Sequence, residues 1–125
     1  MPAALLLDSW AGDLTNAFGA KCYLVGSAVT GKGWRDVDVR MMLEEDAWAR
    51  WFASPDRGFE HDPTWVAMMT AISLWGERVT GLPIDFQMQP RKWANDKHAG
   101  PRLGLGIAKA YPECFKAREL EIEKP

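Results

Sequence analysis

Residues 35–43, RDVDVRMML, constrain the fold of this chain more than any other segment, because charged and apolar side chains alternate along them. That alternation predicts a half-buried β-strand. In such a strand Asp36 and Asp38 project to the same side, with their Cα atoms about 6.5–7 Å apart, while the valine and methionine side chains face a core. By the same parity Arg40 shares the face of the two aspartates.

The segments before this strand predict a helix and another strand. Apolar residues recur at steps of three and four over residues 3–18, which favours an amphipathic helix that Gly19 ends. Residues 21–25 are β-prone and lead directly into Gly26 and the serine after it. Over residues 27–34 we expect one helical turn and a loop, because two glycines interrupt the segment.

The segments after the alternating strand predict two more helices and one more strand. Acidic residues 44–46 begin a helix that Pro55 ends. An Asp-Pro pair, typical of an N-cap followed by the first helical position, begins a second helix that Gly81 ends. Residues 82–89 alternate again, and Asp85 falls on the polar face of the strand they predict.

The chain from residue 91 onward predicts mostly loop, because it is rich in glycine, proline and basic residues until a short charged helix from Glu113. Gly104 and Gly106 are typical of a loop, and His98 is expected at the surface. The whole chain, residues 1–125, has the length of a single domain. The fold class predicted is α/β (α+β), with a small mixed β-sheet flanked by helices.

Composition excludes several classes of protein. Lys and Arg number 15 against 17 Asp and Glu, a net charge of −2, so we expect no polybasic surface that wraps a duplex. No apolar run approaches the ~20 residues that cross a bilayer, and no basic residues precede the N-terminal leucines as in a signal peptide. Cys22 and Cys114 lack zinc-ligand spacing and fit free thiols better than a disulfide, although one bond between them stays open. We therefore expect a cytoplasmic protein without membrane contact.

Carboxylates from two predicted strands can converge on one site. Asp36 and Asp38 share a face of the first strand, and Asp85 lies on the polar face of the second. Such oxygens are the ligands that Mg²⁺ prefers, together with waters and substrate phosphates, and paired ions in phosphoryl-transfer sites lie ~3.5–4 Å apart. Without a cation the carboxylates would repel one another and raise a pKa. The pattern therefore indicates a site for Mg²⁺ or Mn²⁺.

The step from Gly26 to Ser27 suits the binding of an anion. Glycine lets the backbone approach a phosphate closely, and a helical turn that begins at Ser27 would offer free N–H groups. Taken with the aspartates, the stretches LVGSAVTGKGWRDVDVRMML and LPIDFQ resemble the nucleotidyltransferase family of the DNA polymerase β superfamily. That family's pattern is an apolar strand, Gly-Ser, a short spacer, Asp-apolar-Asp-apolar, and a later apolar-Asp-apolar strand.

This resemblance covers residues 21–43 closely and 82–87 loosely. It implies an enzyme that moves a nucleoside monophosphate from a nucleoside triphosphate to a hydroxyl acceptor, with Mg²⁺ or Mn²⁺, and releases pyrophosphate. The residues that it makes catalytic and metal-binding are Asp36, Asp38 and Asp85, the last of which also activates the acceptor hydroxyl. The residues that it places on the nucleotide are Gly26 and Ser27. Basic residues that can supply charge to the triphosphate or the acceptor are Lys32, which we place on the nucleotide, and Arg35, Arg91, Lys92, Arg102 and Lys109.

Larger members of that family add a domain that holds the acceptor, whereas only a short segment follows Asp85 here. The chain is similar in this respect to minimal nucleotidyltransferases, several of which work with a separate protein partner or serve as antitoxins. The acceptor therefore stays open between a small molecule, an RNA end and a protein. The alternative function is a catalytically weak, nucleotide-binding or antitoxin-like partner module with the same fold.

Ordinary structural roles compete for the same residues. Asp36 and Asp38 can be solvent-facing acids that discourage strand-to-strand aggregation and pair with Arg35 or Arg40. Arg40 in particular can neutralise Asp38, because the two share a face. A single acid on a strand, such as Asp85, is common. The three-dimensional arrangement of these side chains decides between the two interpretations.

Overall fold

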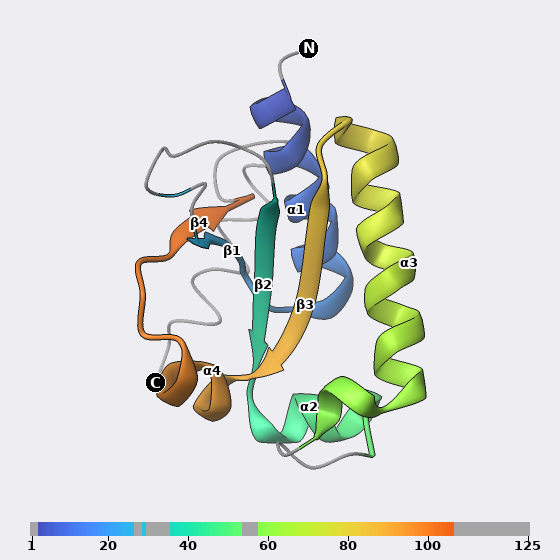
Figure 1. Ribbon diagram of the computed structural model, residues 1–125, viewed down its shortest axis with the longest axis vertical. Coiled ribbons are helices and arrows are strands. Elements are labelled where there is room, and N and C mark those ends of the chain that lie inside the picture. Colours follow the sequence, from blue (N-terminus) through green and yellow to red (C-terminus); the bar gives the residue numbers. More distant parts are fainter. Residues whose placement is uncertain (1–2, 27–28, 30–35, 54–57, 107–125) are drawn as a thin grey trace.

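The computed structural model describes residues 3–26, 29, 36–53 and 58–106. Within these ranges it has one four-stranded sheet, and helices pack against it (Figure 1). The elements in chain order are α1 (Ala3–Phe18), β1 (Cys22–Val25), β2 (Val37–Leu43), α2 (Glu45–Trp51), the 3₁₀ turn η2 (Phe59–His61), α3 (Pro63–Thr80), β3 (Ile84–Pro90), α4 (Arg91–Lys97) and β4 (Leu103–Leu105).

The sheet is mixed, as the sequence predicted. Its strand order is β3-β2-β1-β4; β1 runs antiparallel to both β2 and β4, and β2 runs parallel to β3. A parallel pair needs a long crossover, and α2, η2 and α3 provide it. The predicted class of mixed α and β structure is therefore confirmed.

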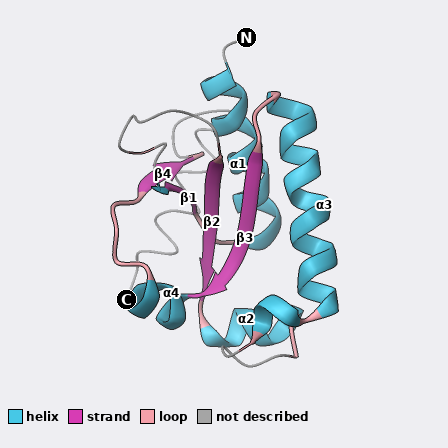
Figure 2. Cartoon of the chain, viewed as in Figure 1, coloured by secondary structure: helices cyan, strands magenta, loops and turns pink. Residues whose placement is uncertain are grey.

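Helices α1 and α3 cover one face of the sheet, and Figure 2 shows α1 behind the strands and α3 along β3. The apolar side chains of β2 and β3 face these helices, and the core includes Trp10, Val39 and Phe86, all with at most 1% of their surface exposed. Gly76 lets α3 approach α1, since a Cβ there would lie 2.7 Å from the Trp10 ring. The opposite face carries the polar residues of the strands.

Helix α3 begins and ends where its sequence predicts. The side chain of Asp62 accepts a hydrogen bond from the backbone N–H of Thr64 at 2.9 Å, and Pro63 occupies the first helical position. Gly81 ends the helix in a left-handed conformation with φ 74°. These caps fix the register of α3 along the sheet.

The same helix protects the edge strand β3. The hydroxyl of Ser73 accepts a hydrogen bond from the backbone N–H of Phe86 at 2.9 Å. The sulfur of Met69 lies 3.1 Å from the backbone nitrogen of Met88. The indole of Trp65 donates to the carbonyl of Met88 at 2.9 Å. Side chains therefore satisfy backbone groups that a sheet edge would otherwise leave open to pairing with another chain.

Two elements differ from the sequence prediction. Residues 91–97 form α4 and residues 103–105 form β4, where the glycine- and proline-rich composition predicted loop. Tertiary contacts explain both. Leu103 and Leu105 pair with β1, and the backbone N–H of Gly106 donates to Asp8 of α1 at 2.7 Å. Gly106, with φ 74°, is required there because a Cβ would lie 2.7 Å from the nitrogen of Gly12.

Some of the predicted features lie outside the described residues. They are the helical turn and loop over most of residues 27–34, with the nucleotide contacts of Ser27 and Lys32, the helix from Glu113, and Cys114. Cys22 is described, and it is a buried free cysteine. Across the described ranges, no helix has the length and apolar character that a membrane span requires.

Candidate functional site

Asp38 and Asp85 are Cα partners in the parallel pair of β2 and β3. Side chains in register on adjacent strands point to the same face, so both carboxylates lie on the polar side of the sheet. Asp36 precedes β2 and is exposed to solvent. Strand parity predicted this shared face, and the structure brings Asp38 and Asp85 together.

Arg40 links the two carboxylates. One of its terminal nitrogens, Nη2, lies 3.4 Å from Oδ2 of Asp85 and 3.9 Å from Oδ1 of Asp38. The other, Nη1, donates to the backbone carbonyl of Asp85 at 2.7 Å. The pairing of Arg40 with Asp38 that parity allowed is therefore present, but Arg40 approaches Asp85 more closely.

The electrostatic environment of Asp38 favours its protonated form. Burial raises the pKa of this carboxyl above its ordinary value, the positive charge of Arg40 lowers it, and the negative charges of Asp85 and Asp36 raise it further. The net effect is a raised pKa. Arg40 alone therefore does not compensate the desolvation of Asp38 and the charge of the neighbouring acids.

Gly26 forms the boundary of the site at the end of β1. Val25 pairs with Asp38, so the next residue lies beside that carboxylate. Gly26 has φ 73°, and a Cβ on it would lie 2.9 Å from Oδ2 of Asp38. Only glycine fits both the left-handed backbone and the close approach. The glycine that the sequence pattern placed on the nucleotide therefore lies against the carboxylate of Asp38.

The donor chemistry of the site fits a divalent ion that shares its coordination with a bound phosphate. Among the described residues, no three His, Cys, Asp or Glu side chains lie close enough together to hold a metal ion by themselves. Mg²⁺, however, is commonly held by one or two carboxylates together with waters and substrate phosphates. Asp38 and Asp85 offer two such carboxylates. A cation would offset the burial and the neighbouring negative charges that raise the pKa of Asp38.

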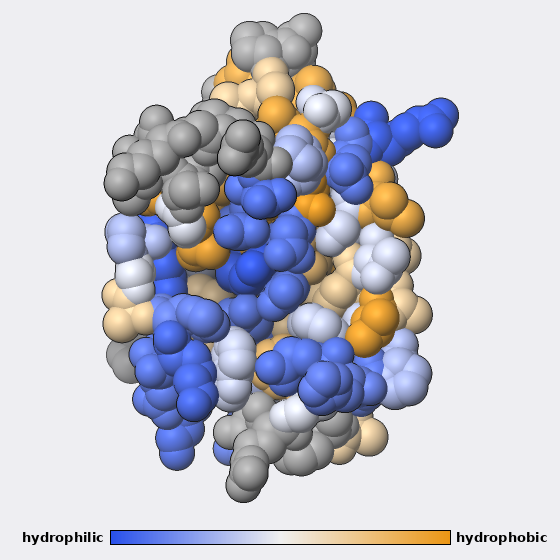
Figure 3. Space-filling view, viewed as in Figure 1, coloured by the Kyte–Doolittle hydropathy of each residue, from blue (hydrophilic) through white to orange (hydrophobic). Residues whose placement is uncertain are grey.

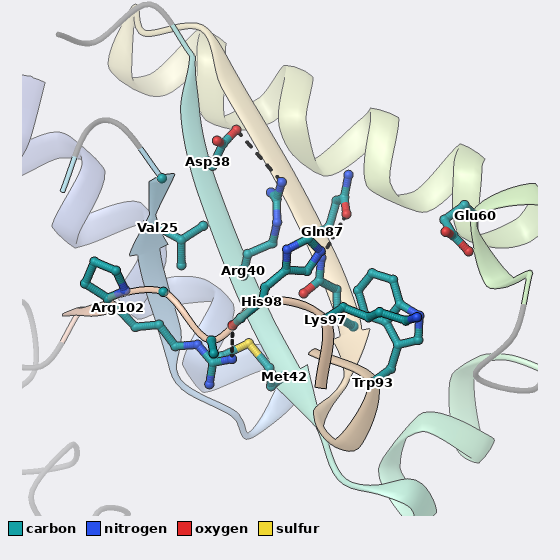
Figure 4. Close-up of a pocket in the computed structure, with 15 residues that line it drawn as sticks. Val25, Asp38, Arg40, Met42, Glu60, Gln87, Trp93, Lys97, His98 and Arg102 are labelled. Atoms are coloured by element: carbon teal, nitrogen blue, oxygen red, sulfur yellow. Dashed lines mark hydrogen bonds and ion pairs between the residues drawn. The ribbon is translucent and has the colours of Figure 1, made fainter. Parts of the chain in front are cut away.

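A cavity of about 950 Å³ extends from Asp38 across the polar face of the sheet to α4 (Figure 4). Hydrophilic residues cover the strands in this region, as Figure 3 shows. The lining residues are Val25, Gly26, Asp38, Arg40, Met42, Glu60, Gln87, Gln89, Trp93, Lys97, His98, Ala99, Gly100, Pro101 and Arg102. Asp85 lines a separate, smaller groove of about 400 Å³ between α3 and β3. Arg40, which contacts both aspartates, is thus at the boundary between the two hollows.

Part of this cavity was not predicted from the sequence. Gln87 and Gln89 share the face of Asp85 by strand parity, a signal that could have identified them. Trp93, Lys97 and His98 come from α4 and its C-terminus, and no local pattern connects them to the aspartates. His98 is exposed, as expected, but it also lines the cavity.

The other basic residues divide between the cavity and the outer surface. Arg102 lines the cavity, whereas Arg91 pairs with Glu44 at the end of β2, and Lys92 is exposed and does not line it. Arg35 and Lys109 lie outside the described residues.

Comparison of the chain with protein-family models, with curated proteins and with solved structures gave no significant match.

Proposed function

We propose that this protein is a nucleotidyltransferase, which moves a nucleoside monophosphate from a nucleoside triphosphate to a hydroxyl acceptor. The observation that carries the proposal is the in-register pair of Asp38 and Asp85 beside the left-handed backbone of Gly26. Carboxylates that share a sheet face next to a glycine, whose backbone carries no side chain, can hold a metal–triphosphate complex. The resemblance of the sequence pattern to the DNA polymerase β superfamily, which includes such a sheet, supports the same function.

The reaction makes one bond and breaks one bond. The oxygen of the acceptor hydroxyl forms a bond to the α-phosphorus, and the bond from that phosphorus to the oxygen bridging the β-phosphate breaks. Pyrophosphate leaves with the electron pair, and the hydroxyl proton passes to the carboxylate of Asp85, whose side chain is half-exposed. Arg40 holds that carboxylate in place through its contacts with the carboxylate and backbone carbonyl of Asp85.

Asp38 and Asp85 would hold the divalent ion, with Asp36 adding negative charge close by. When bound, Mg²⁺ or Mn²⁺ neutralises charge on the triphosphate and orients it for in-line attack. The left-handed backbone of Gly26 ends β1 beside Asp38, where a residue with a side chain would collide with the Asp38 carboxylate. A protonated Asp38 binds a cation poorly, so nucleotide binding should strengthen as the pH rises through the raised pKa of this residue.

A second candidate function is a nucleotide-binding module with little turnover. Arg40 favours it, because a guanidinium that already contacts both carboxylates partly replaces the cation that catalysis needs. Transfer of label separates the two candidates. The protein is incubated with Mg²⁺, triphosphates labelled at the α-phosphate, and a pool of RNA, proteins and metabolites.

The expected result is label on an acceptor with the wild type and none with the double variant Asp38→Asn, Asp85→Asn. The melting temperature should also rise with Mg²⁺ and triphosphate in the wild type and in the control Asp46→Asn, an ion-paired acid on α2, but not in the double variant. A rise in melting temperature without transfer would support the binding module. An equal rise in the wild type and the double variant would contradict both candidates.

A further inference from the structure

The cavity extends well beyond its acidic end, where the proposed triphosphate site lies. Ligand pockets measure about 300–1,000 Å³, and this one, at about 950 Å³, is near the upper limit. Asp38 and Gly26 line one end, whereas the residues that follow α4 line the other. Figure 4 shows Val25 and Asp38 on the strands, and Trp93, Lys97 and His98 on α4 and its C-terminal end. There is therefore room for a second ligand between the sheet and α4.

Positive charge marks the α4 end of the cavity. Lys97 and Arg102 are both lining residues, with the imidazole of His98 between them in the chain. Glu60 is the one acidic lining residue besides Asp38 among those described. Within the described part of the chain Lys97 forms no ion pair, so its ammonium group is open to an anionic ligand.

Arg102 is a preorganised part of this end. Its guanidinium donates to Oδ1 of Asn95 at 2.9 Å and to the backbone carbonyls of His98 at 3.0 Å and Ala94 at 3.4 Å. These carbonyls belong to the C-terminus of α4, whose partial negative charge would repel an anion. Arg102 covers them, and its remaining N–H groups and positive charge stay available, because a guanidinium carries five donors.

Hydrogen-bonding groups for a polar ligand line the floor between the two ends. The amide of Gln89 donates to the amide oxygen of Gln87 at 3.0 Å, and Gln89 is buried. This bond fixes both side chains and leaves one donor group on Gln87 and one acceptor on Gln89 for hydroxyls. Trp93 is held in turn by edge contacts with Phe59 and His98, with ring centroids 4.9 and 5.3 Å away.

We propose that the α4 end of the cavity binds the acceptor, and that this acceptor is a small phosphorylated compound with free hydroxyls, such as a sugar phosphate. Lys97 and Arg102 bind its phosphate, and the two glutamines bind hydroxyls and direct one of them toward Asp38, which lines the same cavity. This inference rests on the proposed nucleotidyl transfer for the role of the ligand, but not for its binding. The volume of the cavity, about 950 Å³, and the net charge of −2 favour a small molecule over RNA.

Binding is tested without metal or triphosphate, so that it does not depend on the transfer reaction. The probes are ribose 5-phosphate, ribose, inorganic phosphate and a short RNA oligonucleotide, each titrated into isotope-labelled protein and followed by NMR. We expect ribose 5-phosphate to shift the backbone signals of residues 97–102 and the indole signal of Trp93. Ribose should have no such effect, and inorganic phosphate should act more weakly because it lacks the hydroxyls.

Lys97→Ala should weaken the binding of ribose 5-phosphate about tenfold, the usual effect of losing one charged hydrogen bond, and Lys97→Arg should restore most of it. The matched control is Lys92→Ala, on the same helix but outside the cavity. Asp38→Asn with Asp85→Asn should leave this binding intact, which separates failure of the subsite from failure of the proposed function. Equal shifts with ribose and ribose 5-phosphate, or shifts with the RNA alone, would overturn the proposal.

Discussion

The α-carbon of Gly26 lies so close to the carboxylate of Asp38 that a side chain at residue 26 has no room. A Cβ there would be 2.9 Å from Oδ2 of Asp38, and the backbone of Gly26 has φ 73°. The backbone at the end of β1 therefore packs directly against the carboxylate of Asp38 on β2.

We expect Gly26→Ala to lower both stability and nucleotide binding. A residue with a Cβ in the left-handed region costs about 1–2 kcal/mol, and the contact with Asp38 must also be relieved. Gly19→Ala is the matched control, because Gly19 has φ 76° and a Cβ there would meet no atom within 4 Å. Urea denaturation should show a loss of about 1–2 kcal/mol in the free energy of unfolding for Gly19→Ala and a larger loss for Gly26→Ala. Only Gly26→Ala should reduce the melting-temperature rise with Mg²⁺ and triphosphate, and the same reduction in Gly19→Ala would contradict the site.

The raised pKa of Asp38 gives a pH dependence of defined sign. The folded protein binds the proton on this carboxyl more tightly than the unfolded chain does. The stabilisation from this proton is therefore complete below pH 3.8, the ordinary pKa of the group, and is lost as the pH rises through the folded-state pKa. Asp38→Asn should therefore raise the melting temperature at neutral pH and leave it unchanged below pH 3.8. Thermal unfolding across the pH range tests this expectation. A lower melting temperature of the variant at neutral pH would mean that the ion pair with Arg40 outweighs burial.

Removing Arg40 should raise the pKa of Asp38 further. Arg40 is the positive charge that lowers this pKa, and Asp85 and Asp36 oppose it. We expect Arg40→Met to show the increase in an NMR titration of the Asp38 carboxyl carbon, and Arg40→Lys to show a smaller one. Arg40→Met should also cost about 1 kcal/mol of stability, because its hydrogen bond to the carbonyl of Asp85 is lost. An unchanged titration would show that the guanidinium does not act on Asp38.

Ser73 should be important for the edge of the sheet. Its hydroxyl accepts a hydrogen bond from the backbone N–H of Phe86 and lies 3.5 Å from the Phe86 carbonyl oxygen. Ser73→Ala therefore leaves this backbone N–H without its hydrogen-bond partner. We expect a loss of about 1–2 kcal/mol and faster hydrogen exchange at the Phe86 amide. Thr70→Ala, at an exposed position one turn earlier on α3, is the control and should leave that amide unchanged. Equal exchange in both variants would contradict the role of Ser73.

Local patterns in the sequence predicted the elements that carry strong local signals. The alternation around Asp36 and Asp38 predicted β2, and the Asp-Pro cap with Gly81 predicted α3. The same alternation placed Asp38 and Asp85 on polar faces, because side-chain direction in a strand follows from parity alone. The nucleotide contacts predicted for Ser27 and Lys32, and the metal, stay predictions.

Tertiary structure alone decided how these parts meet. Parity says which face of a strand an acid occupies, but only the parallel register of β2 and β3 makes Asp38 and Asp85 partners. Likewise the sequences of α4 and β4 carry no capping or alternation signal of their own, and β4 forms by pairing with β1. Arg102 is held on the C-terminal end of α4 by hydrogen bonds. Lys97 and Arg102 line the cavity because α4 packs on β2 and β3, a placement that only the tertiary structure decides.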